Sequence, residues 1–311
     1  MPKRQITNNV KPKYAIELVD FSIIFNEKTK NEFALLSHLN YGFERGKIHF
    51  LVGPSGCGKT VLISHFNGLM FSKHGKILIN GDPIISKHKR IKKVKKLRSQ
   101  IGLVFQFAEY QLFKTTILKD IIFGPMNFGV KKSEAINRAK KLICDVGLDE
   151  TFLKRNPFGL SGGQKRRVAI AGILAINPDI IVFDEPTAGL DPQGEKEIMN
   201  IILELKRQGK TIIVVTHTMN NAIAVADNLV VLNDGKIVKT GSIYEIFADH
   251  KLVAETNLST PLIIQLLQKL SNKDHRFKQI LTHNRPRSIP QMVTDINGVI
   301  KERTKSAHGK N

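Results

Sequence analysis

The chain of 311 residues has no tryptophan, only two cysteines and no run of about 18 apolar residues. Cys57 and Cys144 cannot build a disulfide framework, which favours a reducing compartment. Without a long apolar run the sequence predicts no membrane-spanning helix, and its polar start contains no apolar core of a signal peptide. Hydrophobic residues make up 41% of the chain, so we expect a soluble fold with a sizeable core.

Acidic residues are scarce beside basic ones: 27 Asp and Glu against 48 Lys and Arg give a formal net charge of +21. This balance is typical of proteins that bind nucleic acid or anionic lipid, but it also fits a lysine-rich surface facing solvent. No helix-turn-helix, zinc-finger or RNP-type motif accompanies the charge, which favours the solvated surface. Residues 87–98 hold eight Lys and Arg with Ile91, Val94 and Leu97 at helical spacing, which predicts an amphipathic basic segment. That segment is either one solvated helix face or a surface for phospholipid headgroups.

A glycine-rich segment at residues 53–60 carries the clearest chemistry. It fits the pattern GxxxxGK[ST], follows an apolar strand at residues 48–52 and precedes a helix expected at residues 61–70. Glycines let backbone N–H groups turn toward phosphate oxygens, and the helix N-terminus favours negative charge. We predict a nucleotide-phosphate site in which Lys59 reaches the β- and γ-phosphates and Thr60 coordinates Mg²⁺. Its residues are Gly53, Pro54, Ser55, Gly56, Cys57, Gly58, Lys59 and Thr60.

Polar residues that suit phosphate chemistry follow three further apolar strands. Asp184 and Glu185 end one of them, where a charge is costly without a partner. Asp184 suits Mg²⁺ held through water, and Glu185 can act as general base for water that attacks the γ-phosphate. His217 can position that water, and Gln106 can ligate Mg²⁺ or the water through its amide oxygen. Taken alone, each of these residues also fits a structural role at a strand or helix end.

A second glycine pair lies between these motifs, in the segment Leu160-Ser161-Gly162-Gly163-Gln164. Ser161 supplies a hydroxyl donor, and the two glycines expose backbone N–H groups before a helix expected at residues 165–176. The start of that helix would again favour phosphate. The alternative is a helix whose first turn is capped by serine and has no further role.

Short apolar strands alternate with helical patterns along the chain, which predicts an α/β fold around a parallel sheet. Strands are expected at residues 15–25, 47–52, 76–80, 101–105, 180–183 and 211–216. Helices are expected at residues 132–146 and 195–208, and a hairpin at residues 229–239. Residues 1–13 predict a basic flexible arm. After about residue 248 the pattern changes to a helix at residues 261–270 and a frayed basic tail at residues 271–311.

Together these motifs resemble those of the ATP-binding cassette (ABC) family of ATPases, over about residues 15–250. In this resemblance residues 53–60 correspond to the Walker A loop, residues 160–164 to the signature loop and residues 180–184 to Walker B. The remaining correspondences are Gln106 with the Q-loop, Glu185 with the catalytic glutamate, residues 188–191 with the D-loop and His217 with the switch histidine.

The resemblance implies an α/β fold: a P-loop NTPase core with an antiparallel β subdomain, an α-helical subdomain and a small C-terminal helical extension. The ATPase domain would span residues 14–248, with its helical subdomain at about residues 110–175, and the extension with its basic tail would span residues 249–311. Phe25 is the expected adenine-stacking residue, with Phe21 second, although the family usually has tyrosine there.

Finer features look like the ATPase subunits of energy-coupling factor (ECF) transporters, which import vitamins and metal ions. They are residues 105–113, 123–125, 166–172 and 186–192, together with Pro261 and the helix that follows it. In that group the C-terminal extension is thought to help pair two ATPases. The chain departs from the group at Ala108, where proline is usual, and at Gly159, where an acid is usual.

The family resemblance also implies a mechanism and partners. Two cassettes would bind Mg-ATP between the phosphate loop of one and the Ser161–Gln164 loop of the other, with Glu185 as base and His217 as positioner. The implied partners are a second, non-identical ABC ATPase, a transmembrane coupling subunit and a substrate-binding membrane subunit, at the cytoplasmic side of the cell membrane. The alternatives are the ATPase of another ABC importer, a soluble ABC ATPase acting on nucleic acid or ribosomes, and a non-hydrolysing regulatory cassette. Nucleic acid is not an expected partner.

Overall fold

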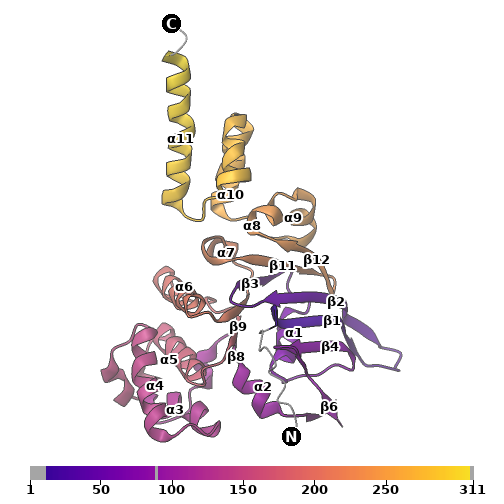
Figure 1. Cartoon of the computed structure of the whole chain (residues 1–311), viewed down its shortest axis with the longest axis vertical. Helices are drawn as coiled ribbons and strands as arrows, with labels where there is room; N and C mark the ends of the chain where they lie inside the picture. The colour runs from indigo at the N-terminus through magenta and orange to yellow at the C-terminus, as the bar shows by residue number, and fades with distance from the viewer. Residues whose placement is uncertain (1–11, 88–89, 309–311) are drawn as a thin grey trace, which may run out of the picture.

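The computed structural model describes residues 12–87 and 90–308. Two β-sheets lie next to each other, a group of helices flanks the larger one, and two helices extend from the C-terminal end (Figure 1). The arm predicted at residues 1–13 lies almost entirely outside the described residues.

The larger sheet is nearly all parallel. In spatial order its strands are β12 (Lys236–Gly241), β11 (Asn228–Asn233), β3 (Ile48–Val52), β10 (Thr211–Val215), β9 (Ile180–Asp184) and β8 (Ile101–Val104). Only β12 pairs antiparallel, as a hairpin with β11. Every residue of β3, β9 and β10 is buried, which explains why these segments are mostly apolar.

The smaller sheet is antiparallel and contains, in spatial order, β2 (Phe33–Glu44), β1 (Tyr14–Phe25), β4 (His74–Ile79) and β5 (Asp82–Pro83). The sequence pattern does not predict β2, because His38 and Asn40 interrupt its apolar alternation. Helix α1 (Lys59–Phe66) buries Leu62 and Phe66 completely in a cluster with residues of both sheets. This packing fixes the loop between β3 and α1 at both ends.

Three helices form a separate group beside β8. They are α3 (Ile117–Asn127), α4 (Lys132–Asp145) and α5 (Gly162–Leu174), accompanied by the 3₁₀ turns η1 (Ala108–Gln111), η2 (Glu150–Lys154) and η3 (Pro157–Gly159). Their apolar faces meet, and Ile121, Ile143 and Ile170 are fully buried. Helix α5 also contacts η1 and β8, so the group is attached to the sheet close to the strand end that leads to Gln106.

The basic segment at residues 87–98 does not form the single helical pattern that its spacing predicts. Strands β6 (Ser86–Lys87) and β7 (Arg90–Ile91) pair as a short ribbon, and helix α2 (Val94–Gln100) begins only after Lys93, whose φ is 54°. Ile91 and Leu97 lie next to Gly68, just beyond α1. Their packing beside the end of α1, rather than helical continuity, explains their spacing.

Four further helices follow β9 and cover the sheet. They are α6 (Pro192–Arg207), α7 (Met219–Val225), α8 (Ile243–Phe247) and α9 (His250–Thr256). Asp191 caps α6 by accepting a hydrogen bond from Gly194 N at 2.7 Å, with proline at the first helical position. Helix α6 therefore provides the crossover between β9 and β10.

The C-terminal part is more helical than the sequence predicts. Helix α10 (Leu262–Lys273) covers the expected helix, but residues 271–311, expected as a frayed tail, contain the turns η4 (His275–Phe277) and η5 (Ile280–Asn284) and the 20-residue helix α11 (Ile289–His308). The tail prediction was wrong here because Met292, Ile296 and Val299 lie at helical spacing and pack with Ile280. Along residues 12–87 and 90–308, no helix is both long and apolar enough to cross a membrane.

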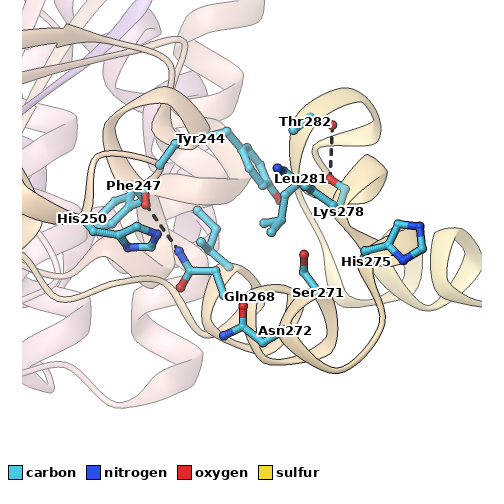
Figure 2. Close-up of a pocket in the computed structure, with 12 residues that line it drawn as sticks. Tyr244, Phe247, His250, Gln268, Ser271, Asn272, His275, Lys278, Leu281 and Thr282 are labelled. Atoms are coloured by element: carbon cyan, nitrogen blue, oxygen red, sulfur yellow. Dashed lines mark hydrogen bonds between the residues drawn. The ribbon is translucent and has the colours of Figure 1, made fainter.

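A cavity of about 530 Å³ lies where the C-terminal helices meet the rest of the chain (Figure 2). Tyr244 and Phe247 line it from α8, and Gln268 lines it from α10, donating a hydrogen bond to Phe247 O at 3.4 Å. Tyr244 also donates to Pro286 O at 2.6 Å. These contacts attach α10 and the turn before α11 to the cassette.

Candidate nucleotide site

The sequence motifs meet at one edge of the larger sheet. Strands β3, β10, β9 and β8 are neighbours and run parallel. Gly53 directly follows β3 and Glu185 directly follows β9, while His217 and Gln106 lie two residues beyond β10 and β8. The carboxyl ends of parallel strands share one edge, which is where open α/β sheets bind ligands. The fold therefore brings together motifs that lie far apart in the sequence.

The glycine-rich loop between β3 and α1 surrounds the ammonium group of Lys59. Lys59 Nζ donates hydrogen bonds to Gly53 O and Pro54 O, at 2.8 Å each. Gly53 has φ of 149°, and a Cβ there would lie 1.9 Å from Leu232 O, so no side chain fits. Gly58 has φ of 98° and directly precedes α1, whose first N–H groups have no partner within the helix. The loop therefore offers a cation and backbone donors to phosphate oxygens.

Asp184 and Thr60 form a pair of hard oxygen ligands beside this loop. Thr60 Oγ1 donates to Asp184 Oδ1 at 3.5 Å, and Asp184 is only 4% exposed. Burial raises the pKa of Asp184, partly offset by the hydrogen bond from Thr60. A buried carboxylate with one long hydrogen bond is poorly compensated, and a divalent cation would compensate it.

The chemistry of these donors fits Mg²⁺ rather than a metal held by the protein alone. Within the part of the chain that the structure describes, no group of three or more His, Cys, Asp or Glu side chains could hold a metal ion. Mg²⁺ commonly binds one or two protein oxygens together with substrate phosphates and water. Thr60 and Asp184 supply that number of ligands.

Glu185 and His217 form a contact pair at the same edge. His217 Nδ1 donates a hydrogen bond to Glu185 Oε1 at 2.9 Å, with the Glu185 side chain 15% and the His217 side chain 73% exposed. Glu185 has φ of 46°, a conformation that costs about 1–3 kcal/mol for a non-glycine residue, and its N–H donates to Val215 O at 2.9 Å. The ends of β9 and β10 thus hold a carboxylate and an imidazole together.

Ser161 and Gln164 form a capping box at the start of α5. Ser161 Oγ accepts from Gln164 N at 3.3 Å, and Gln164 Oε1 accepts from Ser161 N at 3.1 Å. The hydroxyl proton of Ser161 is not used in this box, and both Ser161 and Gly162 are exposed. No hydrogen bond in the described ranges joins this loop to the phosphate loop of the same chain, and Figure 1 draws α5 and α1 in different parts of the molecule.

Gln106 and Phe25 lie at the margins of the site. Gln106 is exposed beyond β8, with no hydrogen bond to Asp184 in the described part of the chain. Phe25 ends β1 and stacks on Phe33 of β2, with ring centroids 5.4 Å apart and planes inclined by 27°. Leu36 lies three residues after Phe33, and a Cβ added at Gly58 would be 2.7 Å from its Cδ2. This end of β2 therefore reaches the phosphate loop. The sequence predicts Phe25 as the adenine-stacking residue but does not indicate its ring partner Phe33, which is 51% exposed.

Sequence reasoning also missed a buried ion pair between the motifs. Arg166 of α5 is 3% exposed and makes a bidentate contact with Glu109 of η1, at 2.9 and 2.8 Å. Its Nη1 donates to Pro186 O at 3.2 Å and to Ala188 O at 2.7 Å, just after Glu185. The charges of Glu109 and Arg166 are visible in the sequence, but only the fold shows that they meet.

Comparisons with known proteins identify the family of this chain. A family model described as ABC transporter matches residues 36–188. The energy-coupling factor transporter ATP-binding protein EcfA2 of Mycoplasma pneumoniae is 44% identical over 305 residues, which cover 98% of each chain. EcfA2 of Mycoplasmoides gallisepticum is 48% identical over 284 residues, 89% of each chain.

Solved structures are similar in fold along most of the chain. CbiO1 of Clostridium perfringens, described as part of the ABC transporter complex cbiONQ, has a TM-score of 0.70 and 32% identity, covering 83% of this chain and 100% of that one. The dimeric post-hydrolysis state of the cassette MJ0796 with ADP and phosphate has a TM-score of 0.64 and 28% identity, covering 73% and 98%. The P-loop NTPase cassette fold predicted from the motifs is confirmed.

The buried carboxylate generates a testable effect on stability. In protein without nucleotide or Mg²⁺, Asp184→Asn should raise the thermal midpoint at neutral pH, because it removes a charge whose burial destabilises the folded state. Since the folded-state pKa of Asp184 is raised, the gain should be complete above that pKa. The gain in thermal midpoint should shrink as the pH falls through the raised pKa of the folded state. It should vanish below the ordinary pKa of the unfolded state, where Asp184 is protonated in both the folded and the unfolded chain. Calorimetric melts between about pH 7 and pH 4 measure it, well above and near the ordinary aspartate pKa.

Asp179→Asn is the matched control for this measurement. Asp179 is an exposed acid immediately before the same strand, so its replacement should leave the midpoint nearly unchanged over the same pH range. A lower midpoint for Asp184→Asn at neutral pH would show that the buried carboxylate stabilises the free protein.

Proposed function

This chain belongs to the energy-coupling factor transporter ATP-binding proteins, a group of ABC transporter ATPases, and from that premise we propose how its site drives transport. It is an ATP-hydrolysing transport ATPase that drives import through an ECF-type transporter. We propose that Mg-ATP binds between residues 53–60 of this chain and the signature loop of a second ATPase. The observation that carries this proposal is the signature loop, which is exposed at Ser161 and Gly162, while its capping box is complete within this chain. The Glu185–His217 pair at the sheet edge where the phosphate loop opens supports hydrolysis there.

In the proposed reaction each residue has a defined task. Lys59 leaves the carbonyls of Gly53 and Pro54 to bind phosphate oxygens, which are stronger acceptors for a cation. Glu185 accepts a proton from the water that attacks the γ-phosphate. His217, held by Glu185 through Nδ1, presents Nε2 to the γ-phosphate or the attacking water. When bound, Mg²⁺ would neutralise charge on the phosphates. Thr60 and Asp184 would hold it, with Gln106 as a further ligand when two ATPases enclose the nucleotide.

The signature loop supports a nucleotide site shared between two chains. Glycine lowers helix stability by about 1 kcal/mol relative to alanine, yet two glycines begin α5. A Cβ at Gly162 would meet none of the described atoms within 4 Å apart from its own helix and chain neighbours, and at Gly163 only Leu190 at 3.8 Å. Packing within this chain therefore does not explain the missing side chains. The missing side chains are explained if the γ-phosphate of a nucleotide held by the partner ATPase comes close to the backbone N–H groups of Ser161–Gln164.

An exposed aromatic surface beside η1 fits a membrane partner. Phe113 and Phe123 are 56% and 41% exposed, pack edge to face at 5.0 Å and lie beneath the ammonium of Lys114. Leu112 and Ala169 line the adjacent groove of about 200 Å³. Exposed apolar grooves of this kind commonly accept an apolar helix.

The chain is a component of a membrane-associated transporter with a partner ATPase and transmembrane subunits. We propose in addition that the partner ATPase is non-identical and that the transmembrane coupling subunit inserts a helix into the groove beside Phe113 and Phe123. A separate membrane subunit would bind the substrate. The cassette would then lie at the cytoplasmic face of the membrane, where ATP is available.

Replacement of the proposed base separates binding from hydrolysis. Glu185→Gln should slow ATP hydrolysis about 10²–10⁴-fold, the usual contribution of a general base, while ATP stays bound because no phosphate ligand is removed. Phosphate release and retained ³²P-labelled ATP measure the two effects. Glu204→Gln, on the exposed face of α6, should alter neither, and loss of ATP binding in Glu185→Gln would contradict the assigned role.

A methyl group at the signature loop tests the shared site. Gly162→Ala should leave the thermal midpoint unchanged or slightly raised, because the position is open and alanine favours helix. Hydrolysis in the assembled transporter should nevertheless fall at least about tenfold, a loss of about 1.4 kcal/mol of transition-state binding, because the Cβ would keep the partner's phosphate away. Gly159→Ala occupies equally open space three residues earlier and should be neutral in both measurements. Equal activity of the two variants would exclude the shared site.

Purification of the assembly tests the partners. A mild-detergent pull-down with this chain as bait should recover a second, different ATPase, a transmembrane scaffold and a small, very apolar subunit, identified by mass spectrometry. Lys114→Gln with Phe113→Ser should reduce recovery of the membrane subunits while the second ATPase remains, because neither residue belongs to the proposed nucleotide site. Recovery of ribosomal proteins or nucleic acid in place of membrane subunits would contradict the proposal.

A further inference from the structure

Arg166 lies at a junction of three segments that surround the proposed nucleotide site. Its guanidinium group makes a bidentate pair with Glu109 of η1, and its Nη1 donates to Pro186 O and Ala188 O after β9. The residue itself is five positions beyond Ser161, in the first turns of α5. One side chain thus joins the segment after Gln106, the signature helix and the loop after Glu185.

The aromatic ring of Phe107 completes this junction. Phe107 lies one residue after Gln106, has φ of 58°, and its ring centroid is 5.7 Å from the guanidinium carbon of Arg166. A Cβ at Gly189 would come within 4.0 Å of the same ring. The segment after Gln106 therefore lies beside the loop after Glu185 and is joined to it through Arg166.

A buried charge network of this kind is not explained by stability. Burial raises the pKa of Glu109, but the hydrogen bonds and the charge of Arg166 outweigh this effect. The pKa is lowered overall, so the carboxylate is ionised at neutral pH. Apolar side chains of similar volume often replace a buried ion pair without loss of stability. Unlike an apolar side chain, the planar guanidinium group of Arg166 can donate at once to the carboxylate of Glu109 and to the carbonyl oxygens of Pro186 and Ala188.

We infer that Arg166 is a positioning residue that couples nucleotide binding at the signature loop and the loop after Glu185 to the position of η1. This inference rests on the proposed function. When a partner's γ-phosphate draws Ser161–Gln164 and the loop after Glu185 toward the subunit boundary, Arg166 moves with them and pulls Glu109. Phe113, four residues after Glu109, follows η1, so the surface for the membrane subunit changes as ATP binds.

Hydrogen exchange in the intact assembly tests this coupling. With Glu185→Gln as background to retain ATP, Mg-ATP should increase protection of residues 107–113, 161–167 and 186–190. Adding Arg166→Lys, which keeps the charge but loses the planar fork, should preserve the response at residues 161–167 and reduce the response at residues 107–113 at least fivefold. Adding Glu109→Gln instead should reduce the response at residues 107–113 only, leaving residues 186–190 responsive.

Controls separate coupling from simple loss of structure. A merely structural role would raise exchange equally with and without ATP, so the ATP-dependent difference is the readout. Arg207→Lys, in an exposed ion pair with Glu204, should change no response. The double variant Arg166→Met with Glu109→Leu leaves no unpaired charge, and it should fold while losing the response at residues 107–113.

The outcomes distinguish this inference from the function on which it rests. If Mg-ATP leaves residues 161–167 of the Glu185→Gln assembly unchanged, the shared nucleotide site is wrong, and the inference falls with it. If residues 161–167 respond and residues 107–113 still respond fully in Arg166→Lys and in the double variant, the coupling role of Arg166 alone is overturned.

Discussion

The parallel pairing of β3, β10, β9 and β8 is the constraint on which the site depends. Val215 of β10 lies opposite both Leu51 and Asp184 in the register, so the strands end together. The phosphate loop, the Asp184–Glu185 pair and His217 therefore begin at one edge without any direct contact being needed to align them. A shift of one residue in this register would exchange the side chains of the shifted strand between the two core clusters on either side of the sheet, so packing on both faces holds the alignment.

The glycines of the phosphate loop and of the signature loop are required for different reasons. At Gly53 the fold itself requires glycine, because Leu232 O occupies the space of a side chain. At Gly162 nothing in the described chain requires it. The first loop is complete within one molecule, whereas the second has its donors exposed and its own capping box satisfied. This difference is the physical basis for placing one nucleotide between two ATPases.

Charge inside the helical group has a separate role. Around Arg166 the chain keeps an ionised pair where apolar packing would suffice for stability. The guanidinium group donates to Glu109 of η1 and to the carbonyl oxygens of Pro186 and Ala188 after β9. Glu109 belongs to a short 3₁₀ turn whose position is not fixed by a long helix. This turn is held by the buried side chains of Ala108 and Leu112 in the core as well as by the ion pair with Arg166, and it leads directly to the aromatic surface at Phe113.

The sequence by itself determined the family, the cassette fold and the identity of the phosphate-binding segments, because glycine patterns and apolar runs act locally and keep their spacing. It also placed β3, β8, β9, β10 and the helices α4, α5, α6 and α10 to within a few residues. It missed β2, whose apolar alternation is interrupted by His38 and Asn40, and α11, whose apolar face at Met292, Ile296 and Val299 lies in a segment rich in basic and polar residues. Only the tertiary structure decided that Phe33 stacks on Phe25, that residues 87–98 divide into a ribbon and a short helix, and that Arg166 meets Glu109, because each of these contacts joins residues that no local periodicity relates.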